Sequence, residues 1–252
     1  MERMRFTGTR RSPGTLRSSL LAVALATALT SCGTDGGTQG SPGEPGTDSR
    51  PSASPTTDLA HLPGIGERLR DRIPSDSRQV IAVYGRGENS ARSTVALFTK
   101  HGTTWDRERS WPAHNGKKGW TTDHREGDKR SPVGVFTLSD AGGVLADPGT
   151  KLRYTRSAAA FTAPRSWPKT HWHDFDLVIA IDYNRVKGTS PGDPTRPQGR
   201  AKGGSIWLHL DHGSGTSGCV SLPEQAMTYL LTTLDPAQKP VIVMGDEDRL
   251  KA

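Results

Sequence analysis

Short apolar runs recur along the chain from about residue 76 onward, separated by polar clusters. The runs are rich in Val, Ile, Leu and aromatic residues and have the length of β-strands. They cover residues 79–84, 94–99, 133–138, 177–183, 205–210 and 241–244. Gly, Asp, Asn and Pro gather between them, as is typical of turns. This pattern predicts a mainly β domain, a sandwich or barrel, over residues 76–246.

Helical periodicity is convincing only after Pro223. The apolar face there is formed by Ala226, Met227, Leu230, Leu231 and Leu234. Ser221 and Glu224 are three residues apart and have the pattern of a capping box, with Ser221 at the N-cap. The sequence therefore predicts one principal helix, and it predicts that this helix starts close behind Cys219.

The first 31 residues have the pattern of an export signal. Several arginines precede the apolar run 20–29, which is too short to span a membrane comfortably. The run ends in Leu-Thr-Ser-Cys, which resembles the lipobox of bacterial lipoproteins, with Cys32 as the lipidated residue. A plain signal peptide with an incidental cysteine is the alternative. We expect residues 1–31 to be removed and Cys32 to anchor the exported protein to the outer face of the cytoplasmic membrane.

Residues 32–60 are dominated by Gly, Ser, Pro and Thr, a composition typical of a flexible tether. Residues 61–75 predict a short helical segment at the edge of the domain. Its Leu-Pro-Gly-Ile-Gly start, residues 62–66, resembles half of a helix-hairpin-helix DNA motif, but only tether precedes it. The chain has a net charge of +7, and without residues 1–31 it keeps 28 basic and 25 acidic residues, or +3. We therefore expect no nucleic-acid partner.

The candidate chemistry lies in residues 203–221, which read GGSIWLHLDHGSGTSGCVS. Cys219 is the only cysteine besides Cys32, so no intramolecular disulfide is expected. A helix start behind Cys219 and a histidine within reach would lower the pKa of its thiol. With His209 on a strand, the two residues form the base and nucleophile of covalent acyl transfer. The alternative is a small buried thiol beside a satisfied core histidine.

This stretch resembles the active-site signature of the YkuD-type L,D-transpeptidase catalytic domain, in which a strand histidine precedes a loop that ends in Ser/Thr-His-Gly-Cys. The chain matches at His209, Thr216 and Gly218-Cys219. Ser217 stands in place of the second histidine, Ser221 in place of the usual Arg or Asn, and the loop is shorter.

Two further stretches extend the resemblance. Residues 131–136, Ser-Pro-Val-Gly-Val-Phe, are similar to the family's Thr/Ser-Pro-x-Gly-x-Phe element. Residues 182–184 and 203–209 are similar to the two strands that lead to the catalytic histidine. The elements follow one another in the family's order over most of the predicted domain.

The resemblance implies a YkuD-like β domain that acts on peptidoglycan stem peptides without a cofactor. Cys219 would be the nucleophile and His209 the base, oriented by a backbone carbonyl, and the amides of Gly218 and Cys219 would form the oxyanion hole. The expected reaction is 3→3 cross-linking through a cysteine acyl-enzyme. An L,D-carboxypeptidase with the same residues and an inactive wall-binding lipoprotein are the alternatives. His212, Ser217 and Ser221 are secondary candidates for the site.

The remaining histidines raise the question of a metal. His171 and His173 form an H-x-H pair, and His209 and His212 form a second pair with the spacing H-x-x-H. The sequence contains neither an H-E-x-x-H motif nor paired cysteines. We therefore predict no metal, and we expect His171 and His173 in a solvated loop or at the rim of the substrate cleft.

Overall fold

The computed structural model describes residues 56–252. The predicted leader, Cys32 and most of the predicted tether lie outside the described residues. Within residues 56–252, no helix is both long and apolar enough to cross a membrane.

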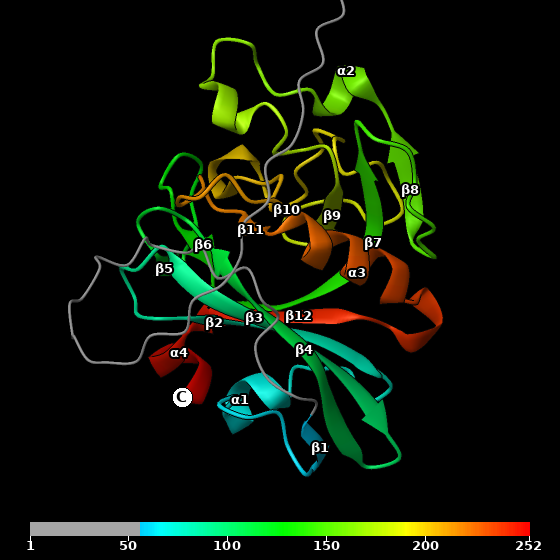
Figure 1. Cartoon of the computed structure of the whole chain (residues 1–252). Helices are drawn as coiled ribbons and strands as arrows, with labels where there is room; N and C mark the ends of the chain where they lie inside the picture. The colour runs from blue at the N-terminus through cyan, green and yellow to red at the C-terminus, as the bar shows by residue number, and fades with distance from the viewer. Residues whose placement is uncertain (1–55) are drawn as a thin grey trace, which may run out of the picture. The chain divides into compact units, whose positions relative to one another are not determined.

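The described chain is mainly β-strand, with four short α-helices (Figure 1). The strands are β1 (Thr56–Leu59), β2 (Gln79–Gly85), β3 (Arg92–His101), β4 (Thr104–His114), β5 (Trp120–Thr121), β6 (Ser131–Pro132), β7 (Gly134–Gly143), β8 (Arg153–Arg156), β9 (Val178–Ile181), β10 (Trp207–Leu210), β11 (Val220–Leu222) and β12 (Val241–Asp246). The helices are α1 (Glu67–Arg70), α2 (Ala158–Phe161), α3 (Glu224–Thr233) and α4 (Glu247–Lys251). Short 3-10 turns lie at Lys169–His171, Arg200–Lys202 and Pro236–Gln238.

The main sheet closes on itself. Its hydrogen-bonded order is β4, β11, β10, β9, β7, β12, β2 and β3, and β3 then pairs with β4. The closing pair is antiparallel and long, from Arg92 opposite His114 to His101 opposite Thr104. At its far end β4 also meets β11, with Ser221 opposite His114. The result is a β-barrel; β1 pairs with β4 and β8 with β7, outside the closed ring.

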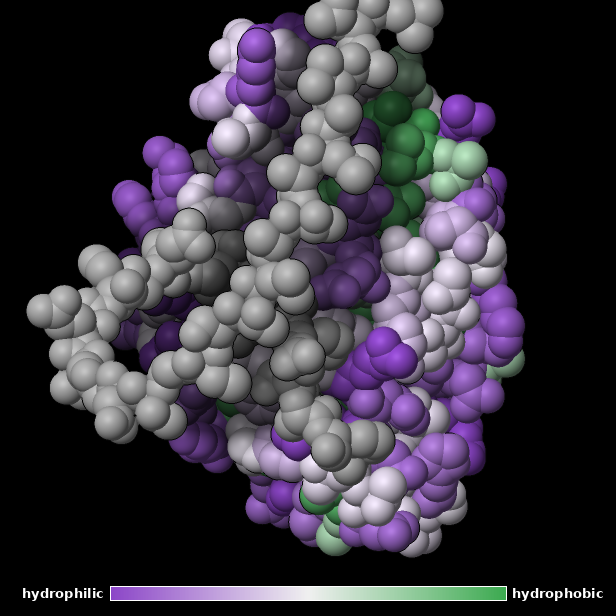
Figure 2. Space-filling view, in the orientation of Figure 1, coloured by the Kyte–Doolittle hydropathy of each residue, from purple (hydrophilic) through white to green (hydrophobic). Residues whose placement is uncertain are grey.

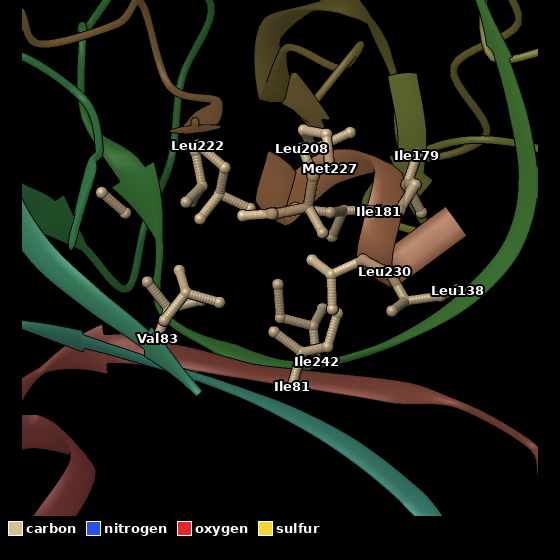
Figure 3. Close-up of a cluster of buried hydrophobic side chains, with 14 of the residues drawn as sticks. Ile81, Val83, Leu138, Ile179, Ile181, Leu208, Leu222, Met227, Leu230 and Ile242 are labelled. Carbon is tan, nitrogen blue, oxygen red and sulfur yellow. The ribbon is translucent and has the colours of Figure 1, made fainter. Parts of the chain in front are cut away.

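The core fills the barrel and surrounds the principal helix. In β2, Ile81 and Val83 point inward, while the residues between them point to the outer face, as the two-residue period of a strand requires. Figure 3 shows Met227 and Leu230 of α3 among side chains from strands on both sides of the barrel. Both faces of β2 are buried, which explains its apolar run from Val80 to Val83.

Two smaller apolar clusters cover the outside of the barrel. One joins Leu69 of α1 and Leu250 of α4 to the outer face of β2, β3 and β12. The other lies under α2 and brings Phe161 and Trp207 together with Phe175 and Cys219. The face shown in Figure 2 is mostly polar, with an apolar patch near α2, whose three alanines are exposed. Cys219 therefore lies on the outer side of the barrel wall.

The structure confirms the predicted mainly β fold with one principal helix after the cysteine, but it corrects the helix start. The capping box is wrong, because Ser221 belongs to strand β11 and the helix begins at Glu224, with Pro223 at the N-cap. Ser221 Oγ donates a hydrogen bond of 2.6 Å to Asp211 Oδ1 instead of capping the helix. A strand therefore separates Cys219 from the helix N-terminus.

Candidate active site

Strand pairing brings Cys219 and His209 to the same face of the barrel wall. β10 and β11 run parallel, with Leu208 opposite Val220 and His209 opposite Ser221. Leu208 and Val220 point into the core, so their neighbours point outward. One step back in the same register, Cys219 lies level with Trp207, and the Trp207 amide donates to Cys219 Sγ at 3.4 Å. His209 and Cys219 are thus diagonal neighbours on the outer face.

His209 is buried and has a defined tautomer. Its Nδ1 lies 2.8 Å from the carbonyl oxygen of Leu210, and because a carbonyl can only accept, Nδ1 carries the hydrogen. The ring packs edge-on against Phe175, with centroids 5.3 Å apart. Burial lowers the pKa of His209 to about 4. The imidazole is therefore neutral at pH 7, and its Nε2 is a hydrogen-bond acceptor.

The thiol of Cys219 is held by backbone groups. Its Sγ donates to the carbonyl of Ser205 at 3.4 Å and accepts from the Trp207 amide. Ser205 itself has a positive φ of 53°, which is unusual for a residue other than glycine. Within the described residues no hydrogen bond joins Sγ to His209.

The pKa of Cys219 differs from the sequence prediction. We expected a thiol acidified by a helix N-terminus, but burial raises its pKa to about 11, and the charge of Asp174 contributes in the same direction. The Trp207 amide opposes this shift without cancelling it. The reason for the error is β11, which moves the helix start away from the sulfur. In this structure the thiol is protonated at pH 7.

Cys219 and His209 line the same cavity, which has a volume of about 290 Å³. The cysteine residue is only partly buried, so the sulfur is not sealed inside apolar packing. The opposite wall comes from the segment before β9 and includes Trp167, His171 and Phe175. Lys117 and Ser217 also line the cavity. The cavity can therefore hold a substrate group against the thiol.

A second polar group in this cavity is built from His171, Asp174 and His212. Asp174 Oδ2 lies 2.9 Å from Nδ1 of His171 and 3.1 Å from Nδ1 of His212. Burial acts to raise the pKa of Asp174, but its contacts with His212 and His171 outweigh this and lower it. One donor atom from each residue lies within 4.8 Å of the others, so the trio could hold a metal ion.

This trio differs from the histidine pairs considered from the sequence. His171 and His173 do not act together, since His173 is exposed and its Nδ1 lies 2.8 Å from Asp176 Oδ2. His209 and His212 stack with ring centroids 6.2 Å apart, and His209 is outside the trio. His171 and His212 both line the cavity, and both contact Asp174.

The sequence profile of the YkuD family, the L,D-transpeptidase catalytic domain, matches residues 88–243, which is more than half of the chain. The chain belongs to the YkuD family. The match contains every residue of the cavity lining and all of the elements β3 to β11.

Two solved structures share similarity with this YkuD protein over part of their length. One is Bd1075 of Bdellovibrio bacteriovorus, with 17% identity and a TM-score of 0.38, covering 75% of this chain and 53% of that chain. The other is a fused Zn-dependent amidase/peptidase/peptidoglycan-binding domain-containing protein of Clostridium acetobutylicum ATCC 824, with 16% identity and a TM-score of 0.30, covering 66% of this chain and 51% of that chain. The chain thus spans about half the length of each. A comparison with curated proteins finds no match.

Within the YkuD domain, the Ser-Pro-x-Gly-x-Phe element has a role that the sequence did not reveal. Ser131 is fully buried, and its Oγ donates to the carbonyl of Gly218 at 2.7 Å while it accepts from the Gly116 amide at 2.9 Å. Thr216 Oγ1 donates to the Cys219 carbonyl at 2.6 Å. Two hydroxyl groups thus fix the backbone on either side of the cysteine.

The same contacts change the predicted oxyanion hole. The Gly218 amide donates to Thr216 Oγ1 at 3.1 Å, so in this structure it does not face the cavity as an open donor. The Cys219 amide lies beside its own sulfur, where it acts to lower the thiol pKa. Of the secondary candidates, Ser217 is exposed at the cavity, whereas Ser221 is fully buried and bonded to Asp211. Ser221 therefore has no direct access to a substrate.

Proposed function

We propose that this protein is a peptidoglycan L,D-transpeptidase that forms 3→3 cross-links through a thioester on Cys219. One observation carries the proposal: His209 on β10 and Cys219, the residue directly before the adjacent parallel strand β11, line one cavity. The hydrogen bond from His209 Nδ1 to the Leu210 carbonyl supports the role of a base, because it leaves Nε2 free of hydrogen. Membership of the YkuD family supports the substrate class.

In the first half of the proposed reaction, Nε2 of His209 accepts the thiol proton as the sulfur attacks a carbonyl carbon. The attacked bond joins the third residue of a donor tetrapeptide stem to its terminal D-Ala. The tetrahedral intermediate collapses, the C–N bond breaks, and D-Ala leaves as an amine after taking the proton back from the imidazolium. The product is a thioester between Cys219 and the third residue.

In the second half, an amine of a neighbouring stem attacks the thioester carbon. His209 accepts the proton of this amine and returns it to the sulfur as the C–S bond breaks. The result is an amide between two third-position residues and a regenerated thiol. If water replaced the amine, the same residues would release a tripeptide, which is the L,D-carboxypeptidase reaction.

The electrostatics favour proton transfer during the attack over a thiolate formed beforehand. The pKa of Cys219 is raised to about 11 and that of His209 is lowered to about 4, so both groups are neutral at pH 7. A neutral pair suits an acyl-transfer step in which the base takes the proton as the bond forms. Before this step, the thiol must turn away from its contact with the Ser205 carbonyl.

The proposal is tested by intact-mass measurement after incubation with meropenem, because carbapenems acylate active members of this family. We expect one covalent adduct on the wild-type protein and none on Cys219→Ala. Incubation with disaccharide-tetrapeptides then separates the two reactions, since dimers indicate cross-linking and tripeptides alone indicate hydrolysis. A folded wild-type protein that stays unmodified would favour a wall-binding role and overturn the proposal.

We also propose that a lipid on Cys32 holds the domain at the outer face of the cytoplasmic membrane. The lipobox-like sequence before Cys32 and the tether composition of residues 32–60 support this placement. In cells, the wild-type protein should fractionate with membranes and incorporate labelled palmitate. Cys32→Ala should lose both properties, and a labelled Cys32→Ala protein would argue against the anchor.

A further inference from the structure

The trio of His171, Asp174 and His212 has the residue types and the spacing of a metal site. Two imidazoles and one carboxylate are ligands that Zn²⁺ accepts, at about 2.0–2.2 Å from the ion. At a tetrahedral angle such ligands stand roughly 3.4 Å apart. The separations of 2.9 and 3.1 Å from Asp174 Oδ2 to the two Nδ1 atoms are close to this value. Small side-chain movements would make room for an ion.

The hydrogen bonding of His212 is an independent observation that favours a ligand at this site. The side chain is only 3% exposed. Neither of its ring nitrogens has a well-aligned hydrogen-bond partner within the described residues, although Nδ1 faces Asp174 and the Gly215 backbone lies nearby. A buried polar group without a partner is costly. An ion bound at Nδ1, between His212 and Asp174, would give this nitrogen a well-aligned partner.

The location leaves coordination positions open toward the cavity. His171, Asp174 and His212 all line the 290 Å³ cavity, and His171 is 27% exposed at its rim. Three protein ligands with an open position are typical of zinc sites that also bind water or another ligand. The rings of His171 and His212 are tilted by 47° to each other with centroids 4.1 Å apart, and both imidazoles contact the same carboxylate.

From this geometry we infer that His171, Asp174 and His212 form a binding site for a divalent transition metal of the zinc type, with its open position in the cavity that Cys219 also lines. The inference does not depend on the proposed transpeptidase reaction. The inferred role of the trio is to bind a metal ion, whereas the proposed role of Cys219 and His209 is to react with the peptide substrate.

The test is a titration of the full chain, freed of metal by a chelator and dialysed, with ZnCl₂ in a calorimeter. We expect saturable binding at a single site that weakens roughly 10- to 100-fold or more in Asp174→Asn and in His212→Gln. His173→Gln and Asp176→Asn are the matched controls, because this neighbouring pair has the same His–Asp contact outside the cavity. Both controls should bind Zn²⁺ as the wild type does.

Further variants and a Co²⁺ spectrum show whether the metal binds at the trio or at the Cys219 thiol, and a substitute variant is available if one fails to fold. Cys219→Ala should keep zinc binding while it loses acylation by meropenem, so that the two proposals fail separately. Co²⁺ should give visible d–d bands without a thiolate-to-metal charge-transfer band. If Asp174→Asn or His212→Gln fails to fold, His171→Gln at the rim replaces it. No binding by the wild type, or binding that is lost in Cys219→Ala and kept in the trio variants, would overturn the inference.

Discussion

His209 Nδ1 donates a hydrogen bond of 2.8 Å to the carbonyl of Leu210, the next residue of the same strand. This contact determines which ring nitrogen can accept a proton, since Nδ1 already carries a hydrogen and Nε2 has a free lone pair. It requires no side chain as a third member. The backbone of β10 therefore orients the imidazole of His209, the proposed base.

Replacing His209 with Asn should separate orientation from basicity. Asn retains an N–H donor near the position of Nδ1 but has no group that corresponds to Nε2. We expect acylation by meropenem to slow by about 10²- to 10⁴-fold, the usual contribution of a general base. The rate of adduct formation by intact mass measures the effect, and circular dichroism checks the fold. Wild-type acylation by His209→Asn would rule out His209 as the base.

The lowered pKa of His209 should make the protein less stable in acid. Above pH 6.5 the imidazole is neutral in both the folded and the unfolded state. As the pH falls from 6.5 toward 4, the unfolded state binds the proton first, so the free energy of unfolding decreases. A shift to about 4 corresponds to a loss of about 3 kcal/mol.

Urea unfolding at pH 7, 5.5 and 4 tests this loss. His209→Asn cannot titrate at this position, so its free energy of unfolding should fall less than that of the wild type over the same range. Other titrating groups contribute equally to both proteins and cancel in the difference. Parallel curves for the two proteins would show that His209 is not held neutral by burial.

Asp174 should influence the reactivity of the thiol. Burial raises the pKa of Cys219, and the negative charge of Asp174 adds to the shift. We expect Asp174→Asn, in buffer with a chelator, to move the midpoint of the pH–rate profile for iodoacetamide alkylation to lower pH. Asp176→Asn removes a neighbouring carboxylate that pairs with the exposed His173 and should leave the midpoint unchanged. An unmoved midpoint in Asp174→Asn would contradict the electrostatic coupling.

Ser131 should stabilise the cysteine loop. Ser131→Ala leaves the Gly218 carbonyl and the Gly116 amide without their shared partner in a buried site. We expect the free energy of unfolding to fall by about 1–3 kcal/mol. Ser217→Ala is the control, because Ser217 is exposed in the same loop and its loss should change stability by less than about 0.5 kcal/mol. Equal effects of the two substitutions would argue against the anchoring role.

Much of the barrel could be predicted from the sequence, because strands buried on both faces are continuously apolar. β2 and β12 are of this kind. The sequence does not predict β4, since its segment contains four consecutive charged residues, of which Asp106, Arg107 and Glu108 are partly exposed and Arg109 is exposed, and it also carries Pro112. This segment forms a strand because it pairs with β3 and β11, and local strand propensity does not predict such pairing.

The site was harder to predict in its electrostatics than in its residues. Cys219 and His209 could be predicted as a pair, because a histidine on a strand and a cysteine at the end of the following loop are close in the sequence and match the family's signature. β11 has only three residues, too few to show a period, and so the helix start was placed too early. The trio of His171, Asp174 and His212 is formed by the packing of two separate segments. The spacing of these residues in the sequence matches no metal-binding motif, so the sequence does not predict the trio.

The closed main sheet determines which parts of the cavity can change by substitution without moving Cys219 and His209. The proposed base, His209, lies on β10, and the proposed nucleophile, Cys219, directly precedes β11. Both strands are hydrogen-bonded to neighbouring strands on either side. The facing wall, with Trp167 and His171, belongs to a connection outside that sheet. Substitutions in the wall can therefore reshape what the cavity admits while the reacting pair keeps its spacing.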